Sequence, residues 1–332
     1  MLSAILSGWC TALKHSGIIS LLHRINANKP RILMYHSIDE QPGILPAALN
    51  VTPKVFEEQL KYLTKNYNVV PLSAIVKALR SNKKLPPHSV ALTFDDGLKN
   101  NLTIAAPLLK KYGCAGTFYI VGQCLEQKKP WIHRWYILNH CVEVKTILAA
   151  LTEQVNQPIK SIRHGVQVLK YYCSCQQREN IIKSLENKFA ISSRSVNQKY
   201  LTLKDIHKLK QDGHEIGYHT QSHSPLAGLT PEGSHKEIVS SKQKVEKQIG
   251  HLNHFAYPFG ESRALGNSLQ LLAKHYDSAV TTVEGLISLK DNPYQLRRLS
   301  VVSGTIPMFA ATVEGARAIA VNAYQFITGA ML

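Results

Sequence analysis

Residues 89–97 read SVALTFDDG, a short apolar run that leads directly into two adjacent carboxylates and a glycine. An apolar run that ends in polar residues is typical of a buried parallel strand, whose C-terminal end is where α/β folds place their ligands. Successive side chains of a strand point to opposite faces. Asp95 and Asp96 can therefore take different roles, one facing a cation and the other facing water. An ordinary Asp-Asp-Gly surface turn is the alternative that this stretch leaves open.

Similar apolar runs recur along the chain from residue 30 onward. They lie at 32–35, 69–72, 90–94, 116–121, 216–218, 255–257 and 279–282. Helix-start signals lie between them, such as Thr52-Pro53, and Thr202 with Asp205 three residues later. About seven strand–helix units predict an α/β fold with a parallel sheet, either closed into a barrel or open and doubly wound.

This alternation is interrupted at residues 126–200, which contain no clear β run. Four helices are expected there, at 131–140, 144–155, 162–173 and 178–189. The segment holds 12 Lys and Arg against 5 Asp and Glu, so much of the positive charge of the chain lies in it. We interpret it as a helical insertion that serves as a lid, as a membrane-docking surface or as an elaboration without catalytic role. The predicted organisation is an N-terminal helix at 1–29, one domain at 30–307 and a C-terminal helix at 308–332.

Composition excludes several classes of protein. The chain has 332 residues, 44% hydrophobic and 18% charged, which excludes a disordered regulator, a disulfide-stapled mini-protein and a multi-span membrane protein. Its net charge of +17 favours contact with a polyanion such as nucleic acid, anionic lipid or an acidic glycan. No nucleic-acid-binding motif is visible, so a nucleic-acid partner is not expected.

The N-terminal segment suggests a membrane surface as a partner. Residues 1–30 carry three basic residues, no acidic residue, and apolar positions at 18, 19, 21, 22 and 25. This pattern is typical of an amphipathic helix on an anionic membrane, although a helix packed on the domain would look similar. No secretory signal peptide is expected, and the cysteine density is low. We therefore expect a cytoplasmic protein, or one peripheral on the cytoplasmic face of the membrane.

A second group of candidate ligands lies in HEIGYHTQSH at residues 214–223. His219 and His223 are four residues apart at the exit of a short predicted strand, the same kind of position that Asp95 and Asp96 occupy. Two histidines and one aspartate leave coordination positions open for water and substrate, which is the composition of a catalytic metal site. Chance spacing is the alternative, because the chain contains 15 histidines.

Four motifs in order resemble the polysaccharide deacetylases, carbohydrate esterase family four, with its NodB-homology domain. TFDDG at 93–97 and HTQSH at 219–223 resemble the first two motifs, and FAYPFG at 255–260 resembles the third. ILMYHS at 32–37 is similar to the opening of the branch that includes the poly-N-acetylglucosamine deacetylases. The resemblance implies a distorted (β/α) barrel of about seven parallel strands and a metal-dependent N-deacetylase.

The resemblance also implies roles for particular residues. Asp96, His219 and His223 match the metal ligands of the family, and Asp95 matches the general base that deprotonates water. His36 is the candidate acid that protonates the leaving amine. The implied cofactor is a divalent metal, for which zinc suits the ligand set and cobalt or nickel are alternatives.

The third motif carries the remaining expectations. The backbone N–H of Phe259 is expected to bind the oxyanion, and Tyr257, Pro258 and Phe259 are candidate substrate contacts. Many members of the family place an arginine, which pairs with the catalytic aspartate, where this chain has Ala256. Arg298, on a later predicted strand, is our candidate substitute, with its neighbour Arg297 as the alternative.

Other histidines and two tryptophans are interpreted as structural. Trp131 and Trp135 lie four residues apart on a predicted helix and are expected in its core. Six histidines without consistent spacing are expected on the surface: His133, His140, His164, His251, His254 and His275.

The predicted function is removal of N-linked acetyl groups from an N-acetylated sugar in a polysaccharide, oligosaccharide or lipid-linked glycan. No G-x-S-x-G nucleophile elbow is present, which argues against a covalent acyl-enzyme route. Two alternatives remain open, an O-acetyl carbohydrate esterase that uses the same site and a catalytically silent glycan-binding module.

Overall fold

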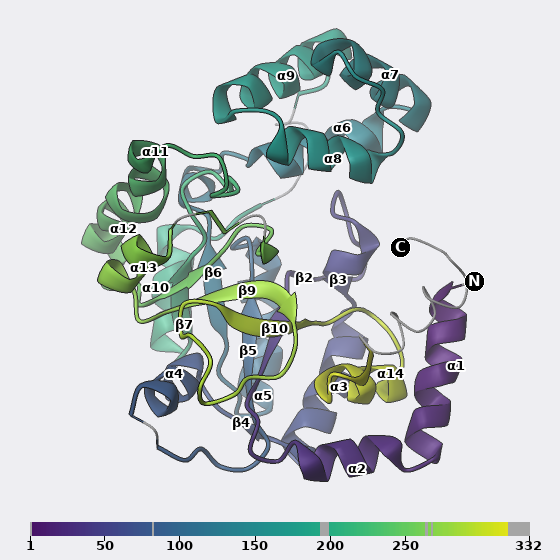
Figure 1. The fold of residues 1–332 in the computed structure, drawn as a ribbon, viewed down its shortest axis with the longest axis vertical. Coiled ribbons are helices and arrows are strands. Elements are labelled where there is room, and N and C mark those ends of the chain that lie inside the picture. Colours follow the sequence, from purple (N-terminus) through teal and green to yellow (C-terminus); the bar gives the residue numbers. More distant parts are fainter. Residues whose placement is uncertain (1, 82, 193–198, 263–264, 267, 318–332) are drawn as a thin grey trace.

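A closed barrel of seven parallel strands forms the centre of the molecule (Figure 1). The computed structural model describes residues 2–81, 83–192, 199–262, 265–266 and 268–317. In the order in which they follow the chain, the barrel strands are β1 (Arg31–Tyr35), β5 (Ser89–Phe94), β6 (Thr117–Ile120), β7 (Glu215–Tyr218), β8 (His254–Ala256), β9 (Ser278–Glu284) and β10 (Leu296–Ser300). Strand β1 pairs in parallel with both β5 and β10, which closes the ring. The barrel prediction is confirmed and the open doubly wound sheet is excluded.

Three short strands complete the β structure. Strand β4 (Asn68–Val69) pairs with β5 on the edge opposite β1, because Val90 is in register with both Val69 and Arg31. Strands β2 (Ser37–Ile38) and β3 (Asn50–Val51) form a separate parallel pair. This pair directly follows β1 in the chain and lies beside the barrel (Figure 1).

Helices surround the barrel, and two of them begin at the start signals that the sequence contains. Thr52 caps the helix that starts at Pro53, and Thr202 forms a capping box with Asp205. The α-helices outside the insertion and the N-terminal region are α3 (Pro53–Asn66), α4 (Leu72–Ser81), α5 (Ala106–Lys111), α10 (Leu203–Gln211), α11 (Pro231–His235), α12 (Ser241–Ile249), α13 (Leu269–His275) and α14 (Ile306–Val313). Shorter helical turns of other pitch occupy Ala47–Leu49, Asn101–Ala105, Gly122–Glu126 and Lys236–Ser240.

Side chains that point alternately to the two faces of the sheet form two separate apolar clusters. Leu33 and Leu92 belong to the cluster that packs under the outer helices, whereas Ile32 and Ala91 belong to a second cluster that also contains Tyr119. Because side chains alternate, Ala91, Thr93 and Asp95 share one side of the chain. The strand that builds the apolar interior thus also directs Asp95 toward the space inside the ring.

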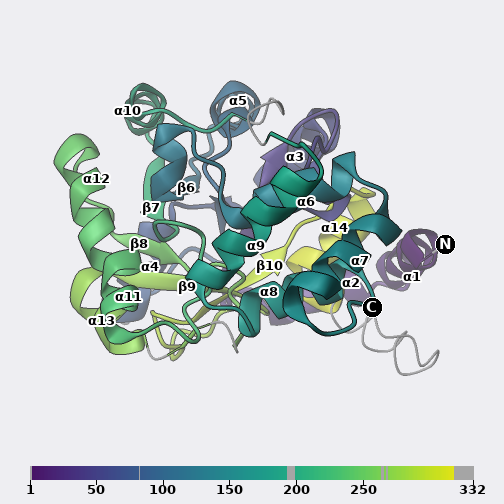
Figure 2. The ribbon, with the colours of Figure 1, turned by 90° about the horizontal axis from the view of Figure 1, so that it is seen from above.

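The insertion forms a small helical layer with its own core. Its helices are α6 (Trp131–Cys141), α7 (Val144–Val155), α8 (Ile162–Tyr171) and α9 (Cys175–Lys188), close to the predicted bounds. Trp131 and Trp135 are buried in this core, as predicted. The layer lies at the end of the barrel toward which the strands run, and seen from above it crosses one side of that end (Figures 1 and 2).

The N-terminal region contains two helices rather than one. Helices α1 (Leu2–His15) and α2 (Ile18–Ile25) are separated at Gly17, whose φ of 80° no regular helix adopts. Both helices contribute to an apolar cluster with α14, through Cys10 and Ile19. The predicted C-terminal helix at 308–332 corresponds to α14 in its first residues, and residues 318–332 lie outside the described part. Among the described residues, no helix has the length and apolarity to cross a bilayer.

A buried carboxylate ties α2 to the base of the barrel. Oε2 of Glu314 accepts hydrogen bonds from Arg31 at 2.7 Å and from Asn26 at 3.2 Å. Oε1 accepts from the Tyr67 hydroxyl at 2.6 Å and lies 2.8 Å from Nδ1 of His23. Burial raises the pKa of Glu314, but Arg31 and the hydrogen bonds more than offset this, so the pKa lies below its ordinary value. We call this group the Glu314 cluster.

Candidate active site

The predicted site residues meet at the C-terminal ends of the barrel strands. Asp95 and Asp96 follow β5, His219 follows β7, and Phe259 lies just beyond β8. Arg298 lies within β10, with its side chain fully buried. Parallel strands bring residues that are distant in the sequence to one rim, where barrel folds place their reactive groups.

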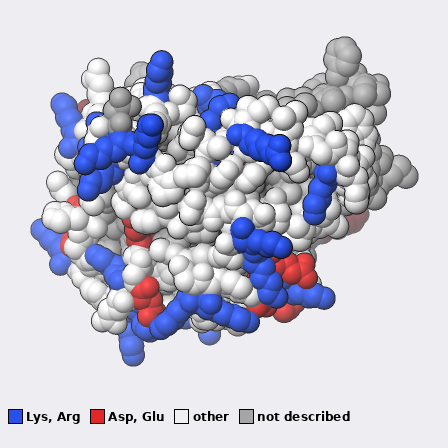
Figure 3. Space-filling view, turned by 90° about the horizontal axis from the view of Figure 1, so that it is seen from below, with Lys and Arg blue, Asp and Glu red and all other residues white. Residues whose placement is uncertain are grey.

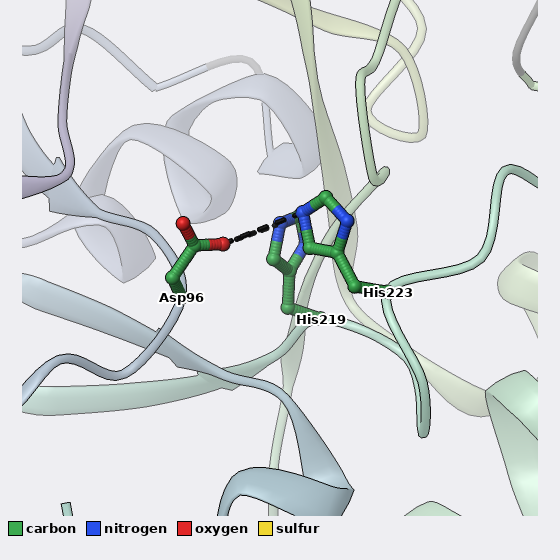
Figure 4. A group of neighbouring side chains, drawn as sticks. All are labelled: Asp96, His219 and His223. Carbon is green, nitrogen blue, oxygen red and sulfur yellow. Dashed lines mark ion pairs between the residues drawn. The ribbon is translucent and has the colours of Figure 1, made fainter. Parts of the chain in front are cut away.

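Asp96, His219 and His223 converge on one point (Figure 4). Oδ1 of Asp96 lies 3.3 Å from Nε2 of His223 and 3.7 Å from Nε2 of His219. All three side chains are buried, and one potential ligand atom from each lies within 4.8 Å of the others. The structure therefore brings together the three residues that the sequence analysis proposed as metal ligands.

The cluster fits a divalent cation on two observations. Oδ1 of Asp96 is buried and makes no hydrogen bond within the described part of the chain, which would cost stability without a ligand. Nδ1 of His219 donates to the carbonyl of Ala256 at 2.7 Å, so Nε2 presents its lone pair toward Asp96. Burial lowers the pKa of His219 to about 4, which keeps this imidazole neutral at pH 7. An Asp-His-His set of this kind suits zinc and other borderline divalent ions.

Asp95 forms a buried two-point ion pair with Arg298. The guanidinium donates from Nη1 to Oδ1 at 2.8 Å and from Nη2 to Oδ2 at 2.7 Å. It is itself held by Thr93 Oγ1 at 3.1 Å and by the carbonyl of Thr281 at 2.7 Å. Burial raises the pKa of Asp95, but Arg298 more than compensates, and the pKa stays below its ordinary value. Arg298, and not the exposed Arg297, thus supplies the pairing that Ala256 cannot.

His36 lies within the electrostatic field of the same carboxylates. Burial lowers the pKa of its imidazole, and the charges of Asp96 and Asp95 partly oppose that shift. Asn101 donates to the backbone carbonyl of His36 at 2.8 Å, which fixes the chain just after β1. The side chain is half-buried and so retains access from the outside.

The Tyr257-Pro258-Phe259 turn divides into a buried part and an accessible part. Tyr257 is fully buried in the barrel core and its hydroxyl donates to the carbonyl of Tyr294, so its ring packs rather than contacting a ligand. The Phe259 ring is half-buried and lies against His223, with centroids 4.9 Å apart. The backbone N–H of Phe259 donates no hydrogen bond to any of the described residues. The turn therefore offers one backbone donor next to the histidine pair.

Left-handed backbone conformations concentrate at this site. Eight described non-glycine residues have positive φ, and four of them belong to the site loops: Asp96, Thr220, His223 and Phe259. Such conformations cost about 1–3 kcal/mol each and persist only where the surroundings enforce them. Here Glu237 enforces one loop, because its carboxylate accepts from the backbone N–H groups of both Gln221 and Ser222 at 2.9 Å.

The insertion contributes a histidine that the sequence analysis placed on the surface. His133 of α6 is buried, and its Nε2 lies 3.2 Å from Oδ2 of Asp96. Because a carboxylate only accepts, Nε2 carries the proton, and Nδ1 accepts from the Tyr200 hydroxyl at 2.7 Å. The surface prediction for His133 was wrong because residues 126–200 match no motif, and no spacing signal marks this histidine.

A second histidine from the same group is also buried. His254 begins β8 and bonds to the Ser278 hydroxyl at 2.9 Å, so its surface prediction was wrong as well. Its place in a barrel strand explains its burial. His140 and His251 are exposed as predicted, and His164 and His275 are half-buried.

The fold and the site together define a (β/α)-barrel protein with a buried Asp-His-His cluster beside an arginine-held carboxylate. The polysaccharide deacetylase family profile matches residues 82–178 and 183–276, more than half of the chain. The chain belongs to the polysaccharide deacetylase family and is a carbohydrate deacetylase.

Known relatives agree with this assignment. YxkH of Bacillus subtilis strain 168, provisionally named a polysaccharide deacetylase, is 26% identical over 286 residues, which are 84% of this chain and 75% of YxkH. The deacetylase PplD of Streptococcus pyogenes, solved in complex with acetate, superposes with a TM-score of 0.57 at 24% identity. The match covers 84% of this chain and 95% of the PplD chain. IcaB from Ammonifex degensii superposes with a TM-score of 0.54 at 16% identity, and the match covers 86% of this chain and 97% of IcaB. The two structural likenesses establish the shared fold.

Proposed function

We propose that this protein is a metal-dependent N-deacetylase that hydrolyses the acetamido group of an N-acetylated sugar within a polysaccharide, oligosaccharide or lipid-linked glycan. One observation carries the proposal. A carboxylate held ionised by a buried arginine lies directly beside the convergent cluster of Asp96, His219 and His223. Amide hydrolysis needs such a pairing, because water must lose a proton while the carbonyl is polarised.

Three residues are proposed to hold the metal. A divalent cation bound by Asp96, His219 and His223 would supply Lewis-acid polarisation of the acetyl carbonyl and lower the pKa of water. The neutral state of His219 and the unbonded Oδ1 of Asp96 support this assignment.

The proton transfers are assigned to Asp95 and His36. Asp95 accepts the proton of the attacking water, and Arg298 keeps this carboxylate ionised and holds both of its oxygens in place. His36 donates a proton to the sugar nitrogen as the C–N bond breaks, so the products are acetate and an amino sugar. Burial lowers the pKa of His36 and the charges of Asp96 and Asp95 only partly oppose that shift, so the imidazole is largely neutral at pH 7 and must gain a proton before it can donate one.

The backbone of Phe259 is the proposed donor to the oxyanion. Its N–H has no acceptor within the described residues and lies in the turn that contacts His223. A single preorganised donor of this kind typically contributes about 10²–10³ in rate. The half-buried Phe259 ring is the proposed sugar contact of the turn, with Pro258 beside it.

The test is acetate release from defined N-acetylated oligosaccharides. We expect release to stop on chelation and to return on addition of zinc, cobalt or nickel. Asp95→Asn should lower kcat by about 10²–10⁴, the usual share of acid–base assistance, while the fold persists. Asp291→Asn is the matched control and should retain activity, because this aspartate contacts the exposed Arg297 and the backbone N–H of Ser288 and no residue of the site.

Three outcomes would separate the alternatives. Acetate release that persists after chelation and in Asp96→Asn would overturn the metal-dependent mechanism. Glycan binding without any release would indicate a silent binding module. Faster release from O-acetylated than from N-acetylated sugars would identify an esterase.

A further inference from the structure

An apolar surface at the base of the barrel lies far from the candidate active site. Seven large hydrophobic side chains are exposed in the described residues, and four of them belong to the first 25 residues. These four are Trp9 at 50%, Ile18 at 43%, Leu21 at 57% and Ile25 at 62% exposure. We call the group the α2 surface.

Helix α2 cannot turn this apolar face inward. At 100° per residue, Ile18, Leu21 and Ile25 fall within a sector of about 60° on one side of the helix. His23 lies on the opposite side of the helix and Asn26 is its C-cap residue, and both contact Glu314 in the interior. The Glu314 cluster therefore holds the helix with Ile18, Leu21 and Ile25 facing solvent, an arrangement that costs hydration free energy unless a partner covers it.

Basic residues border the α2 surface. Lys14, Arg24 and Lys29 are exposed, and residues 1–30 contain no acidic side chain. Within the described part of the chain, none of the three forms an ion pair with a carboxylate. The face seen from below, where α2 lies, shows lysine and arginine side chains around broad uncharged areas and few acidic ones (Figure 3).

We propose that the α2 surface binds an anionic lipid bilayer, with Ile18, Leu21 and Ile25 at the boundary of the acyl chains. Charge complementarity selects this occupant. A second copy docked on the same face would bring the basic residues of both copies together, whereas anionic headgroups neutralise them. Apolar side chains flanked by lysine and arginine on a helix lying in the interface plane are the features of an interfacial helix.

Vesicle sedimentation of the full chain tests this proposal. The probes are vesicles of phosphatidylcholine with an equal amount of phosphatidylglycerol, and vesicles of phosphatidylcholine alone. We expect binding to the anionic vesicles only, weakened in 0.5 M NaCl. The double variant Leu21→Glu with Ile25→Glu should weaken binding at least about tenfold, and Arg24→Gln roughly fivefold, the contribution of one basic residue near an anionic surface. The matched control Val144→Glu with Tyr172→Glu adds the same charges at exposed positions on the insertion and should bind normally.

Each other result would overturn the proposal. Equal binding to both vesicle types, or unchanged binding by the Leu21→Glu and Ile25→Glu variant, would remove the α2 surface from membrane contact. Light scattering that shows a dimer dissociated by the same variant would identify a second copy as the occupant. Vesicle binding gained only when the chain ends at Arg317 would assign residues 318–332 as the cover. Deacetylase activity on a soluble oligosaccharide is measured in parallel, so a failure of the proposed function is seen separately.

A different observation gives His133 a positioning role. We infer that His133 orients the Asp96 carboxylate, because it donates to Oδ2 while Oδ1 remains directed at the two imidazoles. Tyr200 in turn fixes the His133 ring through Nδ1. The helical insertion thus completes the cluster from outside the barrel. This inference rests on the proposed cation site.

Zinc titration of the metal-free protein by calorimetry tests the positioning role of His133 separately from the cation site. We expect His133→Phe to weaken zinc affinity by about 10–100-fold, the usual effect of removing a partner of a metal ligand, and Tyr200→Phe to weaken it less. Tyr136→Phe, a ring that packs near His133, is the control and should leave the affinity unchanged. Absence of zinc binding in the unmodified protein would defeat the cation site itself. Normal binding in both the unmodified protein and His133→Phe would defeat only the positioning role.

Discussion

Replacing Arg298 by methionine tests the buried ion pair at the centre of the candidate site. The substitution removes two hydrogen bonds to Asp95 and leaves a buried carboxylate without its counter-charge. Breaking a buried pair in this way costs about 3–5 kcal/mol of the free energy of unfolding. Arg297→Met is the matched control, because that side chain is exposed and its ion pair with Asp291 is worth at most about 1 kcal/mol.

The sign of the pH dependence follows from the pKa of Asp95. Arg298 holds this pKa below the ordinary value, so the pair stabilises the fold above the unfolded-state pKa and is lost as pH falls through the folded-state pKa. Without Arg298, burial, which raises the pKa of Asp95, is opposed only by the His219 and His36 imidazoles. The stability deficit of Arg298→Met should therefore shrink as the pH falls, and the acid limb of kcat/KM should move to higher pH.

Urea unfolding at several pH values and a pH profile of acetate release measure both effects. Arg298→Lys should recover part of the stability but not the two-point geometry, because an ammonium is a point charge. An Arg298→Met variant with the control's stability and an unshifted acid limb would refute the argument that this pair maintains the ionised base.

Four further predictions concern Glu314, Gly217 and the candidate cation site. Glu314→Gln should lower the free energy of unfolding by about 3–5 kcal/mol, because Arg31 stays buried without a counter-charge; a urea midpoint equal to that of the unmodified protein would contradict this. The stabilisation by Glu314 should disappear as the pH falls through its lowered pKa, which urea midpoints at pH 7 and at successively lower pH can follow. Gly217→Ala should cost about 1–3 kcal/mol, because its Cβ would lie 2.3 Å from the Tyr119 ring and 2.9 Å from a carbonyl of β8; thermal unfolding with an unchanged midpoint would contradict it. Zinc at 100 times its Kd should stabilise the protein by about 2.7 kcal/mol, and the Asp96→Asn variant should lose most of this gain in the same thermal assay.

The barrel and much of its rim were predictable because the necessary signals are local. A buried strand that ends in Asp95-Asp96 and another that ends before His219 place these side chains at one edge of any parallel sheet. His223 follows on the same loop. Their convergence is then a consequence of strand direction, which the apolar runs already indicate.

The choice of Arg298 over Arg297 depended on three-dimensional structure. Adjacent residues of a strand face opposite sides of the sheet. The sequence therefore limits the substitute to Arg297 or Arg298, but it does not show which of the two faces the interior of the barrel. The barrel closure turns Arg298 inward to Asp95 and leaves Arg297 exposed.

His133 could not be found from the sequence at all. Its contact with Asp96 depends on how the insertion packs over the rim, and a helix carries no signal of which distant loop it will cover. The outward apolar face of α2, by contrast, is visible as residue spacing. Its fixed orientation is known only from the contacts that Glu314 makes on the other side.

The direction of the strands has a geometric consequence. Helix α2 leads straight into β1, whereas the candidate catalytic groups follow the far ends of the strands, so bilayer contact would point the catalytic opening away from the lipid. Strands of five to six residues are about 17–20 Å long, and a strand tilt of about 36° reduces the separation along the barrel axis to about 14–16 Å. A sugar attached close to a lipid headgroup in the same leaflet would fall short of that height, and a long glycan chain extending from the bilayer would reach it.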